Sequence, residues 1–186
     1  MELLKAFQRR ISGRSYNAST IFQCSVFHRF IKLSEAFSQL MDTKNIEAAL
    51  SLLRPMFDCL KYIFLVSTVD DPNGFCEKIF EPVPQISDLK VTARWFNDGK
   101  KVGLGEGAIP KMMDGSGLFK GMSDFYGHLC SYVHNSPSQI SHIFSEDPGQ
   151  FTIGGDIAFD NETLVKEAWD DFNLIQSICA KMVHYI

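Results

Sequence analysis

Arg54, Asp58 and His134 are the residues whose types and spacing come nearest to a catalytic set. Arg54 and Asp58 stand four positions apart, so on a helix their side chains lie one turn apart on the same face. A guanidinium group binds anionic groups, and a histidine exchanges a proton near neutral pH. As a site, Arg54 would bind an anionic group and His134 would act as acid, base or phosphate contact.

A structural interpretation accounts for the same three residues. Arg54 and Asp58 can form an intrahelical ion pair worth a few tenths of a kcal/mol. His134 precedes Asn135, Ser136 and Pro137, so it lies at the end of a helix, where the helix dipole favours a protonated imidazole. The two interpretations differ in whether Arg54 and His134 meet, and both stay open at this point.

Other chemistries have less support. Ser131 could bond to His134, one turn later, or to a carbonyl of its own helix, and the chain has no nucleophile elbow GxSxG. His128 and His134 are six positions apart, on different faces of a helix, and His142 does not complete a zinc pattern. The glycine-rich stretch 98–107 lacks the Lys-Ser/Thr of a phosphate loop. We therefore expect no metal and no cofactor.

Composition predicts one globular domain, 1–186. Hydrophobic residues make up 45% of the chain and charged residues 22%, as in ordinary globular proteins. A net charge of −4 argues against nucleic-acid binding by the whole surface. The five cysteines show no CxxC spacing, which favours a reducing compartment. We find no pattern of a signal peptide and no apolar run that could cross a membrane, so we expect a cytoplasmic protein.

Two long helices are predicted in the first half of the chain. The first covers Asn17–Met41, with Ser19 or Thr20 as its cap. Its apolar residues repeat every three or four positions and form one seam: Phe22, Val26, Phe30, Leu33, Phe37 and Leu40. A turn at 42–44 leads into the second helix, Asn45–Ser67, so the pair should form an antiparallel hairpin.

The helix Asn45–Ser67 carries an apolar face centred on Leu53 and a polar flank beside it. The flank contains Glu47, Arg54, Asp58 and Lys61. Pro55 removes a hydrogen-bond donor and clashes with the preceding turn. We therefore expect a kink here, or two abutting helices with the second beginning near Pro55.

The second half of the chain predicts further helices and one β element. A short helical turn is expected at 75–80, helices at 87–97, 118–134 and 161–185, and a small β-hairpin near 150–159 around Gly154-Gly155. The residues expected to be buried on the last helix are Val165, Ala168, Phe172, Ile175, Cys179 and Met182. The sequence thus predicts an all-α fold, a four-to-six-helix bundle with long antiparallel helices and a small β-hairpin insertion.

Two stretches, LLRPMFDCLKYIF and FYGHLCSYVHNS, resemble an uncharacterised prokaryotic helical family with HEPN-like character. In that family an RxxxE helix is followed by a tyrosine-rich helix that ends in Ser-x-x-His. The resemblance implies a site made of five residues: Arg54, Asp58, Tyr126, Ser131 and His134. Asp58 stands where the family commonly has Glu. HEPN ribonucleases carry on one helix an Arg, usually followed by a polar residue, then four to six residues and a His, and this chain has no Arg and His at that spacing.

We therefore expect a helical-bundle protein of unassigned biochemical activity that acts through protein association, with a protein partner or as a homo-oligomer. The resemblance implies a prokaryotic defence or stress system. The alternative is a metal-independent HEPN-like ribonuclease that uses Arg54 and His134 on RNA. Neither hypothesis involves a membrane.

Overall fold

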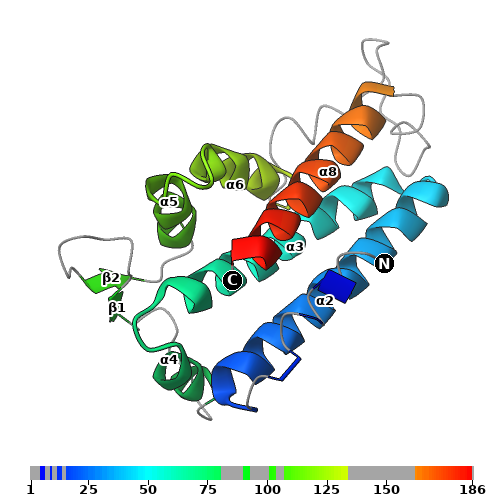
Figure 1. Ribbon diagram of the computed structural model, residues 1–186. Coiled ribbons are helices and arrows are strands. Elements are labelled where there is room, and N and C mark those ends of the chain that lie inside the picture. Colours follow the sequence, from blue (N-terminus) through cyan, green and yellow to red (C-terminus); the bar gives the residue numbers. More distant parts are fainter. Residues whose placement is uncertain are drawn as a thin grey trace.

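Six helices make up most of the chain that the structure describes (Figure 1). The computed structural model describes residues 5–6, 9, 12–13, 16–80, 90–92, 101–103, 107–133 and 162–185. The helices are α2 (Ala18–Asp42), α3 (Ile46–Thr68), α4 (Pro72–Ile79), α5 (Ala108–Gly115), α6 (Met122–Ser131) and α8 (Glu162–Tyr185). The all-helical prediction is confirmed for most of these residues. The hairpin predicted near 150–159 lies outside them.

Helices α2 and α3 form the predicted hairpin. Asn17, rather than Ser19 or Thr20, caps α2, because its side chain accepts a hydrogen bond from the Thr20 N–H (2.9 Å). At the other end, the Asn45 N–H donates to the Leu40 carbonyl (2.8 Å), which closes the helix in a Schellman turn. The Asn45 side chain then caps α3. One residue therefore ends the first helix and starts the second.

The buried face of α2 differs in part from the predicted seam. Phe30 and Phe37 are fully buried as expected, but Phe27 and Met41 are buried beside them. The other members of the seam, Phe22, Val26, Leu33 and Leu40, are only half-buried at the edge of the core. The reason is that α2 packs against three helices, α3, α4 and α8, so its buried surface is wider than a single seam.

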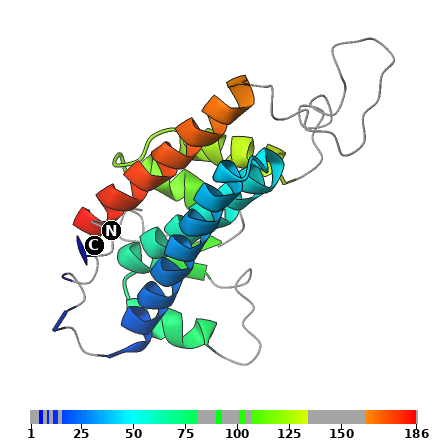
Figure 2. The ribbon, with the colours of Figure 1, turned by 90° about the vertical axis from the view of Figure 1, so that its right-hand side faces the viewer.

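Helix α3 lies at the centre of the fold, with α2 and α8 on one side and α5 and α6 on another (Figures 1 and 2). This placement explains why it is buried nearly all round, as expected for a central helix. The two-helix alternative at Pro55 is wrong, because α3 continues through this residue as one helix. Burial of side chains such as Leu53 and Phe57, each worth about 1.5–3 kcal/mol, offsets the lost backbone hydrogen bond.

Helix α8 runs alongside α2 in the opposite direction (Figure 2). The ring of Phe172 stacks on Phe37 at 4.4 Å, and Trp169 meets Phe37 edge-on at 5.4 Å. One turn further along α8, the Gln176 side chain donates to the Ser34 hydroxyl (2.9 Å). Since α2 is also antiparallel to α3, helices α3 and α8 point the same way. The predicted boundaries of α8 agree with the structure to within one residue.

The helix predicted at 118–134 is shorter than expected, since α6 begins at Met122. Gly121 takes a left-handed conformation (φ 78°), which a glycine adopts without cost and which breaks the helical path. The carboxylate of Asp114, at the end of α5, accepts the N–H groups of Met122 (2.6 Å) and Ser123 (3.1 Å). A side chain from another helix thus caps α6, which local sequence does not reveal.

The helix predicted at 87–97 is wrong, because Lys90–Thr92 is strand β1. It pairs antiparallel with β2, Lys101–Gly103, with Val91 opposite Val102. Both short strands contain β-branched residues, which favour extended backbone, and the pairing partner lies ten residues away. Among the helices that the structure describes, none is long and apolar enough to span a bilayer.

Candidate functional site

Two residues of the predicted site, Arg54 and Tyr126, meet where α6 packs on α3. The Arg54 Nη2 group donates a hydrogen bond to the Tyr126 hydroxyl (3.1 Å), and its Cζ atom lies 5.5 Å from the centre of the ring. Tyr126 is only 7% exposed. Residues 72 positions apart in the chain are therefore in direct contact.

Asp58, the third predicted residue, lies in the same cluster but forms its ion pair with Lys61. Lys61 Nζ lies 2.6 Å from Asp58 Oδ1, in a geometry that is electrostatic rather than that of a hydrogen bond. The same Nζ atom sits 4.2 Å from the centre of the Tyr126 ring, a cation–π contact. Lys61 was predicted on the polar flank of the helix, yet it is 4% exposed, because α6 covers that flank.

Arg54, Asp58, Lys61 and Tyr126 will be called the α3–α6 cluster. Burial raises the pKa of Tyr126 to about 12, the Arg54 hydrogen bond opposes this, and the Asp58 carboxylate adds to it. The phenol therefore keeps its proton at neutral pH. Tyr126 is consequently a hydrogen-bonding group and a ring for cations to pack on, and it is a poor nucleophile.

Ser131, the fourth predicted residue, forms a hydrogen bond within α6. The Ser131 hydroxyl donates to the backbone carbonyl of His128 (2.6 Å), which matches the interpretation of Ser131 as bonded within its own helix. His134 lies outside the described residues, so the predicted meeting of Arg54 and His134 stays a prediction.

A second polar cluster, which sequence reasoning missed, joins α6 to α8. His128 Nε2 lies 2.9 Å from Asp171 Oδ2, and the Tyr132 hydroxyl donates to the same Oδ2 atom (3.0 Å). Tyr132 is also 2.8 Å from His128 Nε2. These three residues will be called the α6–α8 cluster. The spacing of His128 and Tyr132, one turn apart, was visible in the sequence. Their partner Asp171, about forty residues later, was not.

The environment of the α6–α8 cluster determines how its groups behave. Burial raises the pKa of Tyr132 well above its usual range, and the negative charges of Asp171 and Glu167 add to this. The Tyr132 hydroxyl thus keeps its proton and donates a hydrogen bond to Asp171. Side-chain exposure is 45% for His128 and 15% for Asp171, so the imidazole is within reach of solvent. Such a pair can orient a proton-transfer group, or it can simply join two helices.

No protein-family model, no curated protein and no solved structure matches this chain. Within the described part of the chain, no group of three or more His, Cys, Asp or Glu side chains is arranged to hold a metal ion. The function is therefore argued from the residues of the two clusters and from the surface around them.

Proposed function

We propose that this protein acts by associating with another protein, and that a second copy of the chain is the first partner to test. The observation that carries the proposal is a group of exposed apolar side chains around the first turns of α2. Tyr16 is 95% exposed, Ile21 46% and Phe80 54%. Large apolar groups gathered at one place on a surface are typical of protein contacts.

Helix α4 packs against the first turns of α2 at one end of the molecule (Figure 1). The Ser19 N–H donates to the Asn73 side chain of α4 (3.2 Å), and the Phe80 ring meets Phe22 edge-on at 6.2 Å. Phe80 covers part of Phe22 and leaves its own outer face exposed. Burial of this face against another molecule would stabilise a complex.

The α3–α6 cluster supports the same proposal. Its charged and polar groups are engaged with one another: Arg54 with Tyr126, and Lys61 with both Asp58 and Tyr126. The hydrogen bond and the cation–π contacts to Tyr126 join α6 to α3. Residues that would serve catalysis are thus used to hold α6 against α3.

Sedimentation velocity over a range of concentrations tests this proposal. Wild type should show a concentration-dependent dimer, and Tyr16→Ser should weaken it about tenfold, since loss of one central aromatic contact costs about 1.4 kcal/mol or more. Leu174→Ser, at a 42% exposed position on α8, is the matched control and should leave the dimer unchanged. A monomer at every concentration, or equal weakening by both variants, would contradict the proposal.

A metal-independent HEPN-like ribonuclease is the second candidate function, within the prokaryotic defence or stress setting that the resemblance implies. The observation that favours it is the convergence of Arg54, Asp58 and Tyr126 from two helices. In this hypothesis Arg54 orients a phosphate and His134 serves as acid or base.

Incubation with total RNA in EDTA tests the ribonuclease candidate. Wild type should cleave RNA, whereas His134→Ala and Arg54→Lys should lose most of the activity, at least about a hundredfold. His28→Ala, at an exposed histidine of α2, is the control and should cleave normally. If wild type and His134→Ala both cleave, or if neither does, His134 has no catalytic role.

A further inference from the structure

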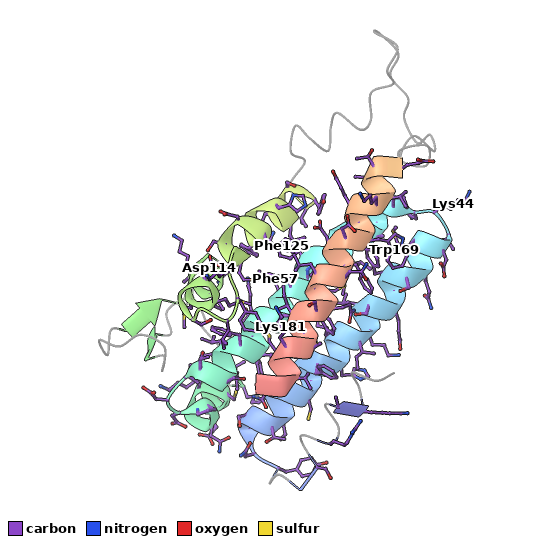
Figure 3. The ribbon with its side chains drawn as sticks, turned by 45° about the horizontal axis from the view of Figure 1, so that its top comes forward. Lys44, Phe57, Asp114, Phe125, Trp169 and Lys181 are labelled. Carbon is purple, nitrogen blue, oxygen red and sulfur yellow. The ribbon has the colours of Figure 1, made fainter. Side chains whose placement is uncertain are left out.

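A cavity of about 400 Å³ opens where the α2–α3 turn meets the start of α8. Residues from the end of α2, the turn, the start of α3 and the start of α8 line it: Met41, Lys44, Ile46, Glu162, Val165 and Lys166. Figure 3 shows Lys44 at this end of the molecule, with Trp169 further along α8 between the helices. The volume falls in the range of sites that hold small molecules, roughly 300–1,000 Å³. Neither polar cluster contributes a residue to it.

The lining combines an apolar floor with a charged rim. Met41 and Ile46 are 7% and 3% exposed, and Val165 is half-buried beside them. The exposed side chains of Lys44, Lys166 and Glu162 bring two ammonium groups and one carboxylate to the rim. A ligand that fits this chemistry has an apolar body and an anionic end.

The backbone of Lys44 gives an independent indication. Lys44 has a φ of 65°, and it is the one described residue other than glycine with a positive φ. It occupies the turn position after α2 that glycine usually fills, because a side chain there costs about 1–2 kcal/mol. A lysine thus stands at the rim of the cavity at a position where glycine would be less strained. Strain of this kind is typical of functional sites.

We propose that this cavity binds a small amphiphilic carboxylate, such as a medium-chain fatty acid. Lys44 and Lys166 contact the carboxylate, while the alkyl chain lies on Met41, Ile46 and Val165. This binding is independent of protein association at the α2–α4 end and of any ribonuclease activity.

Isothermal titration calorimetry with octanoate below its micellar concentration tests the proposal. Saturable binding at one site per chain is expected. Octanol, which lacks the charge, and acetate, which lacks the chain, should each bind at least about tenfold more weakly. Co-sedimentation with phosphatidylglycerol vesicles tests whether the protein instead binds an anionic lipid surface. We expect the protein to stay in the supernatant.

Two variants separate ligand binding from stability. Lys44→Gly should weaken octanoate binding about fivefold to tenfold and yet raise the thermal midpoint of unfolding, because glycine relieves the strained turn. Lys166→Gln should weaken binding by a similar factor with little effect on unfolding. The control is Lys181→Gln, at an exposed position near the other end of α8 (Figure 3), which should bind as wild type does.

Several results would overturn the proposal. They are no saturable binding of octanoate, equal binding of octanol, binding to vesicles only, or unchanged affinity in Lys166→Gln. If Lys44→Gly fails to fold, the comparison of Lys166→Gln with Lys181→Gln still decides the matter.

Discussion

The two polar clusters share helix α6 but differ in how far water reaches them. In the α3–α6 cluster the Lys61 and Tyr126 side chains are almost fully buried. In the α6–α8 cluster the His128 side chain is 45% exposed. The buried Lys61 ammonium depends on Asp58 and on the Tyr126 ring, whereas solvent can replace a lost partner of the half-exposed His128 imidazole.

The difference in solvent exposure changes what the loss of one partner costs in each cluster. A buried ion pair contributes little by itself, yet removal of one member leaves an uncompensated charge. The His128 imidazole is 45% exposed, so water can take the place of a lost partner and the loss costs less. Substitutions should therefore affect stability strongly at the α3–α6 cluster and weakly at the α6–α8 cluster.

The largest effect is expected at Asp58. Asp58→Ala should lower the free energy of unfolding by about 2–3 kcal/mol, because the buried Lys61 ammonium loses its carboxylate. The effect falls short of a fully buried pair since 34% of the Asp58 side chain is exposed. Urea denaturation followed by circular dichroism measures it.

Lys61→Met provides the control for this prediction. Methionine keeps the apolar volume of the side chain without a charge to satisfy, so this variant should lie within about 1 kcal/mol of wild type. The double variant Asp58→Ala, Lys61→Met should recover most of the stability lost in Asp58→Ala. If Asp58→Ala alone is as stable as wild type, the Asp58 carboxylate does not compensate the charge of Lys61, and the proposed difference between the two clusters is wrong.

An intermediate effect is expected at Asp114, which caps the helix that both clusters share. Asp114→Ala should cost about 2 kcal/mol at pH 7, because two backbone N–H groups of α6 lose a charged acceptor. Hydrogen exchange should increase at Tyr126 and at His128 together. Faster exchange in only one of them would show that the clusters open independently.

This contribution should depend on pH in a known direction. Burial would raise the pKa of Asp114, but the Ser123 side chain and the N–H groups of Met122, Ser123 and Gly121 favour the carboxylate more, so the pKa is lowered from 3.8. The stabilisation is therefore present above pH 3.8 and is lost as the pH falls through the lower, folded-state pKa. Wild type and Asp114→Ala should converge in stability at that acidic end. A constant difference would contradict a charged cap.

The smallest effect is expected at Asp171. Asp171→Ala should cost about 1 kcal/mol, because the Tyr132 hydroxyl keeps His128 Nε2 as a neighbour and the imidazole keeps solvent. Thermal or urea unfolding of this variant beside Tyr132→Phe measures it. If Asp171→Ala lowers the free energy of unfolding as much as Asp58→Ala does, the two clusters do not differ in the way described.

The sequence by itself determined the three long helices. The three- and four-residue spacing of apolar side chains predicted α2, α3 and α8 to within one or two residues, because amphipathic periodicity depends only on the geometry of one helix. On α8, four of the six residues expected in the core are fully buried: Ala168, Ile175, Cys179 and Met182. The same local information predicted neither β1 nor the start of α6, since a distant partner strand and the distant carboxylate of Asp114 specify them.

The tertiary structure alone decided the surroundings of the polar residues. Lys61 lies on a flank that one helix would expose, and it is buried because α6 covers it. Arg54 reaches Tyr126, and Asp171 reaches His128 and Tyr132, across distances of tens of residues in the chain. Periodicity fixes which side of a helix a residue occupies, but burial and hydrogen bonding depend on what packs there. For that reason the apolar core could be predicted, whereas the burial of Lys61 and the contact of Asp171 with His128 and Tyr132 could not.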